Sequence, residues 1–100
     1  MAYAHITEFD SGDDRSTTNY DALAQRVWDL AQPAGALHHS AGFDENGVFR
    51  MYEVWDSRGH RERFVKETLE PLLAEGLADP TRTDPPSREY GYELHFATDA

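Results

Sequence analysis

Hydrophobic residues recur along this chain with the period of a strand in some segments and the period of a helix in others. Few folds have strands and helices in the order in which these segments occur. In chain order the segments are residues 2–9 (strand), 20–31 (helix), 36–43 and 48–55 (strands), 57–76 (helix) and 89–97 (strand). This β-α-β-β-α-β order is that of the split βαβ motif, in which two helices cover one face of a four-stranded antiparallel sheet. We therefore predict an α+β, ferredoxin-like fold.

Length and composition indicate one domain over residues 1–100. One hundred residues are enough for one modest hydrophobic core and too few for two. Hydrophobic residues make up 39% and charged residues 28% of the chain, which is typical of globular proteins. Residues 77–88 contain three prolines, so we expect an extended connection there.

Capping residues and helix breakers delimit the two helices. Thr18 followed by Asp21 is a plausible capping arrangement for the first helix, and Ser57 is suited to cap the second. Gly76 suits the end of the second helix, and Pro71 predicts a kink or a short break before it. The predicted buried stripe of the second helix consists of Phe64, Val65, Leu69, Leu72 and Leu73.

The Asn46-Gly47 pair between the two middle strands is a strong hairpin signal, and the length of its loop decides which side chains share a face. A two-residue loop aligns His38 across from Trp55. A three-residue loop with a bulge brings His39 to that face instead. The residues alone leave both registers open.

Both faces of the predicted sheet carry apolar side chains. On the third strand, Phe49 and Met51 alternate with Tyr52 and Val54, and the last strand adds tyrosines to one face. Because the two helices cover only one face, the other exposes a contiguous apolar surface near the limit that soluble monomers tolerate. We therefore expect a homodimer.

Charge and cysteine content exclude several classes of function. Nine basic residues against nineteen acidic ones give a net charge of −10, so nucleic acid and anionic membranes are poor partners. The absence of cysteine excludes disulfides, thiolate metal sites and cysteine nucleophiles. No apolar run is long enough to span a membrane and residues 1–20 contain no targeting segment, so we expect a cytoplasmic protein.

Several motifs resemble the dimeric α+β barrel superfamily, which includes antibiotic-biosynthesis monooxygenases, heme-degrading monooxygenases and polyketide cyclases. The resemblance lies in the strand-to-helix junction 54–57, in Phe64 and in the Leu69-Glu-Pro-Leu-Leu73 segment. The residues 39–42 before the hairpin and 20–22 at the first helix look most like small uncharacterised members.

The resemblance implies a ligand pocket between sheet and helices, beside Trp55, and a dimer built from the opposite sheet face. It implies that His5 faces the cavity, and it favours His39 over His38 as the second pocket histidine. Two positions depart from the family. Ala74 stands where heme-degrading members carry their iron-ligating histidine, and Met51 stands where cofactor-free quinol and anthrone monooxygenases carry an asparagine.

Histidines carry the candidate chemistry, because imidazole exchanges protons near neutral pH. His5 and His39 are the candidate catalytic residues, while His60 is expected to be solvated at the start of a helix. Glu53 either serves as a buried base or pairs with an arginine. No histidine spacing along the chain indicates a metal site, which leaves open only a site assembled across strands, for example from His5 and His95. The predicted substrate-binding residues are Trp55, Glu53, Met51, Phe64 and Tyr3.

The leading hypothesis is a small-molecule enzyme of secondary or aromatic metabolism that acts without a bound cofactor. In it, two histidines perform acid-base work in an apolar pocket, in a monooxygenase-like or cyclase-like reaction on a polyketide-like aromatic. The alternative is a non-catalytic or regulatory dimer that only holds a small apolar or aromatic molecule. An enclosed pocket with converging histidines would favour the enzyme.

Overall fold

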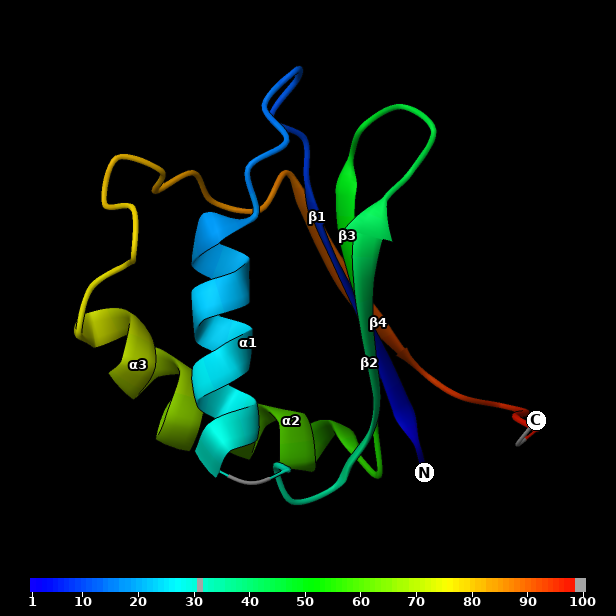
Figure 1. Ribbon diagram of the computed structural model, residues 1–100. Coiled ribbons are helices and arrows are strands. Elements are labelled where there is room, and N and C mark those ends of the chain that lie inside the picture. Colours follow the sequence, from blue (N-terminus) through cyan, green and yellow to red (C-terminus); the bar gives the residue numbers. More distant parts are fainter. Residues whose placement is uncertain (31, 99–100) are drawn as a thin grey trace.

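A four-stranded antiparallel sheet forms one layer of the protein. In the computed structural model, which describes residues 1–30 and 32–98, β1 and β3 are the central strands and the order is β2-β3-β1-β4. The strands are β1 (Tyr3–Phe9), β2 (Ala36–Phe43), β3 (Phe49–Trp55) and β4 (Arg88–Glu93). All helices lie on one side of this sheet (Figure 1). The predicted α+β, ferredoxin-like fold is confirmed.

The first helix, α1 (Thr18–Leu30), begins two residues earlier than its apolar stripe indicated. Its first turn is closed by a backbone hydrogen bond from Asp21 to the Thr17 carbonyl, and the Thr17 hydroxyl donates to the Asp21 carboxylate. The polar residues ahead of Tyr20 therefore extend the helix, which a search for apolar periodicity does not detect.

The second helix is continuous but irregular. It consists of α2 (Arg58–Phe64), the π-helical segment η1 (Val65–Leu69) and α3 (Glu70–Ala74), and Ser57 caps it as predicted by accepting the His60 N–H at 3.2 Å. The backbone stays right-handed helical at both junctions, so no break occurs at Pro71. Since proline has no N–H to donate, the irregularity falls in the preceding turn, where the Glu70 N–H reaches back to the Val65 carbonyl.

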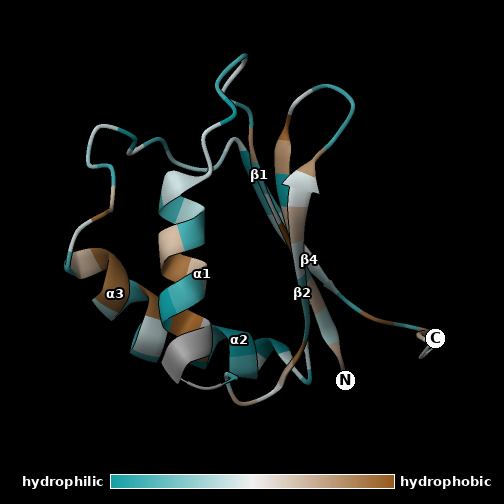
Figure 2. Cartoon of the chain, in the orientation of Figure 1, coloured by the Kyte–Doolittle hydropathy of each residue, from teal (hydrophilic) through white to brown (hydrophobic). Residues whose placement is uncertain are grey.

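The polarity of this composite helix changes along its length, from hydrophilic in α2 to largely hydrophobic in α3 (Figure 2). Leu72 is buried, and Phe64, Val65 and Leu69 are half-buried. Leu73 was predicted to be buried, and this is wrong, because 42% of it is exposed. Its side chain borders the cleft described below instead of packing into the core.

The hairpin between β2 and β3 has the register of a three-residue loop. Asp44 and Val48 are joined by a backbone hydrogen bond across residues 45–47, and Gly47 adopts a left-handed φ of +82°. A tight turn closed by a left-handed glycine is the usual geometry of such loops. Consequently His39 lies opposite Glu53, on the face that carries Trp55, and His38 lies opposite Val54.

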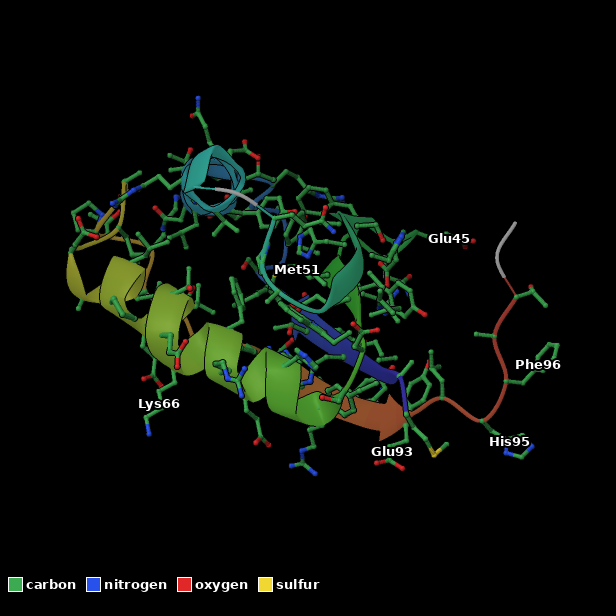
Figure 3. The ribbon with its side chains drawn as sticks, turned by 90° about the horizontal axis from the view of Figure 1, so that it is seen from below. Glu45, Met51, Lys66, Glu93, His95 and Phe96 are labelled. Carbon is green, nitrogen blue, oxygen red and sulfur yellow. The ribbon has the colours of Figure 1, made fainter. Side chains whose placement is uncertain are left out.

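The last strand is shorter than predicted. β4 ends at Glu93, and residues 94–97 were wrongly assigned to it. Leu94 still donates to the Ala2 carbonyl, but β1 begins at Tyr3, so the chain beyond has no strand left to pair with. Figure 3 shows His95 and Phe96 on a tail that leads away from the sheet.

The two faces of the sheet differ in what covers them. The face toward the helices carries Tyr3, His5, Thr7, Met51, Glu53 and Trp55, and the Trp55 ring packs 5.1 Å from that of Phe64. The opposite face, which no other element of the described residues covers, carries Ala4, Ile6, Tyr52, Val54, Tyr90 and Tyr92. Ala4 and Ile6 are nonetheless buried by their neighbours, while Tyr90 and Tyr92 are exposed.

Candidate functional site

A cleft of about 630 Å³ lies between α1, the helix-covered face of the sheet, the composite helix and the connection after it. That volume is within the range that holds a small organic ligand. Much of the lining is apolar or aromatic: Phe9, Leu23, Ala24, Val27, Phe43, Phe49, Met51, Phe64, Leu69, Leu73, Leu77 and Pro86. Figure 3 shows Met51 between the helices and the sheet.

The connection after the composite helix closes one side of the cleft and is held by Asn19 on α1. The Asn19 amide donates to the carbonyls of Asp79 and Arg82, both at 3.1 Å, and its oxygen accepts the Asp79 N–H at 2.7 Å. Residues 77–87 thus contain no helix or strand, as predicted, but they are not extended throughout, because the Arg82 N–H donates to the Asp79 carbonyl in a turn, and Arg88 already belongs to β4.

A tyrosine and a histidine meet inside the cleft. The Tyr20 hydroxyl lies 2.6 Å from His39 Nε2, and the two rings are nearly parallel, with an interplanar angle of 11°. Tyr20 comes from the first turns of α1, where its ring also packs edge-on against Phe49, and His39 comes from β2. The contact therefore joins the two layers of the protein.

The environment determines the protonation states of these two side chains. Burial lowers the pKa of His39 below its ordinary 6.5, with His38 adding to this and Glu53 opposing it. Burial raises the pKa of Tyr20 above 10.0, and the nearby Asp21 and Glu53 carboxylates raise it further. At neutral pH the imidazole is therefore unprotonated and the phenol protonated, and in the tautomer that carries its hydrogen on Nδ1, His39 Nε2 accepts the Tyr20 hydroxyl hydrogen.

A second polar group forms where β1, β3 and β4 meet the composite helix. His5 Nε2 lies 2.7 Å from Glu89 Oε1, and Arg61 lies 3.5 Å from the same oxygen and 3.3 Å from Glu53 Oε1. Glu53 also accepts the indole N–H of Trp55 at 2.8 Å. Glu53 thus pairs with an arginine, one of the two roles considered for it.

The hydrogen bonds of His5 use both ring nitrogens. Because the Glu89 carboxylate only accepts, His5 Nε2 donates to it at 2.7 Å, and the Tyr3 hydroxyl is hydrogen-bonded to Nδ1 at 3.0 Å. His5 and Tyr3 are both buried. The three side chains form a line that leads from the core of the sheet to the cleft, where Glu89 is part of the lining.

The predicted site residues fall into two groups. His39, Glu53, Met51 and Phe64 line the cleft. His5, Tyr3 and Trp55 lie behind that lining, where they contact residues that form it.

The other histidines lie outside the cleft. His38 is exposed on the opposite sheet face, where its ring lies 5.5 Å from that of Tyr52 at an interplanar angle of 57°, and His95 lies on the exposed tail. His60 was expected to be solvated, but it is half-buried, hydrogen-bonded to the Ser57 hydroxyl at 2.7 Å and packed against Gly35. Within residues 1–30 and 32–98, no group of three or more metal-ligating side chains is gathered at one place.

Sequence reasoning missed Tyr20, Arg61 and Glu89 as site residues. Tyr20 was assigned to the apolar stripe of its helix. Side chains alternate between the two faces of a strand, and Tyr90 and Tyr92 lie on the face opposite to the helices. Glu89 must therefore point toward the helices, which the sequence could have predicted. Arg61 had no signal beyond its place on a polar turn of the helix.

Comparison with known proteins finds the fold and no close relative. No family profile and no curated protein matches the chain. A solved protein of Chloroflexus aurantiacus J-10-fl, named as a candidate antibiotic biosynthesis monooxygenase, is 17% identical, with a TM-score of 0.63 and coverage of 99% of this chain and 98% of the other.

Proteins of the same name from Nitrosomonas europaea and Deinococcus radiodurans are also similar. They are 14% and 19% identical, with TM-scores of 0.65 and 0.58. The alignments cover 98% and 100% of this chain, and 94% and 98% of the other chains. The chain therefore has the ferredoxin-like fold of antibiotic biosynthesis monooxygenase-like proteins. In the part of the chain that the structure describes, no helix is long and apolar enough to cross a bilayer.

Proposed function

We propose that this protein is a small-molecule enzyme that works without a bound cofactor and removes a proton from a phenolic or enolisable aromatic, polyketide-like substrate in the cleft. The observation that carries the proposal is the 2.6 Å hydrogen bond between Tyr20 and His39 inside a largely apolar cavity. An unprotonated imidazole held against a tyrosine hydroxyl is a general base with a relay.

Proton transfer uses the tautomer of His39 in which Nε2 carries no hydrogen and accepts from Tyr20. A substrate O–H or acidic C–H next to Tyr20 gives its proton to the phenol oxygen while the Tyr20 proton passes to His39 Nε2. Glu53, directly across from His39 on β3, favours the imidazolium that results. The transfer leaves an enolate or phenolate of the substrate beside the imidazolium of His39, which compensates its charge.

The fate of that anion decides the overall reaction. Attack on dissolved O₂ converts a CH₂ group to a carbonyl with release of one water, which is monooxygenation. Attack on a carbonyl of the same molecule closes a ring instead. The names of the three solved neighbours favour the first outcome. Neither reaction needs a redox cofactor, because the anion itself supplies the electrons.

The remaining predicted residues take supporting parts in this proposal. Met51 and Phe64 form apolar walls for the substrate, and Trp55 supports Phe64 from behind. His5 acts through Glu89 instead of on the substrate, since both of its ring nitrogens are engaged. It is a positioning residue.

We also propose that two copies of the chain pair through the open face of the sheet. Tyr90 and Tyr92 are exposed there beside Tyr52 and Val54. A second copy is the partner of the right chemistry, because the same apolar surface meets itself across a twofold axis.

Oxidation of dihydroxyanthrone to the quinone tests the enzyme proposal, with O₂ consumption and quinone absorbance measured above the uncatalysed rate. Tyr20→Phe and His39→Gln are each expected to lower kcat/KM by about 10²-fold or more. His38→Gln and Tyr52→Phe make the same changes in a tyrosine and a histidine that contact each other on the opposite face, and they are expected to leave kcat/KM unchanged.

Two outcomes would contradict the proposal. Full activity in Tyr20→Phe and His39→Gln would remove these residues from the chemistry. Binding of dihydroxyanthrone in the cleft without turnover would favour the alternative, a non-catalytic dimer that holds a hydrophobic molecule.

A further inference from the structure

The charged side chains that line the cleft differ in how far they are already paired. Arg61 lies between the carboxylates of Glu53 and Glu89, and only 15% of its side chain is exposed. Arg82, the other arginine of the lining, pairs with Asp14 and Asp79. Each guanidinium is thus shared between two carboxylates, and neither is available to hold an anionic ligand.

Glu89 is the carboxylate that a ligand can reach. Its side chain is 44% exposed, whereas that of Glu53 is 11% exposed and accepts from both Trp55 and Arg61. Glu89 Oε1 accepts from His5, and within residues 1–30 and 32–98 no hydrogen bond reaches Oε2. This oxygen is an acceptor whose hydrogen-bonding capacity is unused.

The position of Glu89 is fixed from behind. The Tyr3 hydroxyl orients His5, and His5 orients the Glu89 carboxylate. The side chains of Tyr3 and His5 are both buried. Such a support lowers the entropy cost of binding a ligand to the carboxylate, because the acceptor is already in place. A surface glutamate without these contacts would offer no such preference.

We infer that Glu89 accepts a hydrogen bond from a hydroxyl group of the substrate, so that the cleft selects neutral hydroxylated aromatics and rejects carboxylated molecules of the same size. The inference rests on the proposed small-molecule cleft, but it concerns binding and not the reaction. A hydroxyl donor completes the coordination of Oε2. An anionic ligand is repelled by the carboxylates of the lining and by the net charge of −10, and the arginines of the lining are already paired.

Three probes of one size test this inference: naphthol, its methyl ether and naphthoate, all substituted at the same ring position. Their binding is followed by quenching or enhancement of naphthalene fluorescence at neutral pH. The wild-type protein is expected to bind naphthol about tenfold more tightly than the ether, the worth of one hydrogen bond to a charged acceptor. Naphthoate is expected to bind more weakly than either.

Glu89→Gln keeps the shape of the side chain and removes its charge. It is expected to lower the naphthol-to-ether ratio severalfold and to raise the affinity for naphthoate. Glu93→Gln makes the same change at an exposed glutamate of the same strand, outside the cleft lining, and is expected to leave both affinities within about twofold. Circular dichroism shows whether each variant folds, and the order of the three probes on wild-type protein tests the inference without any variant.

Equal binding of naphthol and its ether to the wild type would overturn the inference, as would the absence of binding by all three probes or an equal effect of Glu93→Gln and Glu89→Gln. Its failure is distinct from that of the proposed function. Turnover of dihydroxyanthrone with no preference for naphthol would leave the enzyme proposal standing. A preference for naphthol with no turnover of dihydroxyanthrone would support the inference and contradict the enzyme proposal.

Discussion

The side chain of Tyr3 lies across the backbone of Gly91, in the space that a Cβ atom on residue 91 would occupy. Gly91 is the pairing partner of His5 on β4, and the Tyr3 hydroxyl passes over it to reach His5 Nδ1. The glycine is therefore required for the hydrogen bond that orients His5 and, through it, Glu89.

Gly91→Ala is expected to destabilise the protein by about 1–3 kcal/mol, because the new methyl group overlaps a ring that is itself buried. The Tyr3–His5 hydrogen bond is lost at the same time. Urea denaturation gives the free energy of unfolding. Gly42→Ala is the matched control on β2, where a Cβ meets nothing within 4 Å, and its stability is expected to stay within about 0.5 kcal/mol of the wild type. Equal stability of the two variants would contradict this account of Tyr3.

The pH dependence of kcat/KM follows from the Tyr20–His39 pair. Burial holds the pKa of His39 below 6.5, so its acid limb is expected below that pH. The pKa of Tyr20 lies above 10.0, so its alkaline limb is expected above that pH, and activity is constant between the two. An acid limb above pH 6.5 in the profile of the free enzyme would show that another group is the base.

Acid stability depends on Asp44 at the hairpin. Its Oδ1 accepts the N–H groups of Asn46 and Val48, and the Val48 bond is the main cause that lowers its pKa below 3.8. A carboxyl whose pKa is lower in the folded state stabilises the protein fully above its unfolded pKa, and this stability is lost as the pH falls through the folded value.

Asp44→Asn is therefore expected to be less stable than the wild type at neutral pH and to converge with it below the folded pKa of Asp44. Thermal unfolding between neutral and strongly acid pH measures this difference. Glu45→Gln is the control, since Glu45 projects away from the hairpin (Figure 3). A constant gap between Asp44→Asn and the wild type at all pH values would contradict the role of the ionised carboxylate.

Most of the fold was predictable because it depends on local patterns. The alternation of apolar residues gave the elements in order, and Ser57 and Asn46-Gly47 marked a cap and a turn through their own local chemistry. The register of β2 was not decided by these signals. It depends on Asp44, whose side chain binds the two N–H groups of the loop and so favours the three-residue form that brings His39 into the cleft.

The candidate site was only partly predictable because its contacts join distant parts of the chain. His39 was found by resemblance and meets Tyr20 from another layer. Glu89 meets His5 across 84 residues of sequence, and nothing near Glu89 distinguishes it from the other acidic residues. The limits of β4 depended likewise on where β1 begins, which no pattern within residues 94–97 reveals.

The open face of the sheet leads to the last prediction, a concentration-dependent homodimer. Tyr92 is 48% exposed on an edge strand, next to the partly exposed Tyr90 and across from Ala4 on β1. Burial of such rings against a second copy stabilises the pair by about 25 cal/mol for each Å² of apolar surface removed from water. Tyr92→Lys places a charge in that contact and is expected to shift the protein toward monomer.

Sedimentation velocity at micromolar concentration measures the shift. Ala74→Lys is the matched control, because it adds the same charge at an exposed position of α3, on the helical side of the molecule. If Ala74→Lys dissociated the dimer as effectively as Tyr92→Lys, the contact would lie on the helical side or depend only on net charge. If the wild-type protein sedimented as a monomer at this concentration, the proposed pairing through the open face of the sheet would be contradicted.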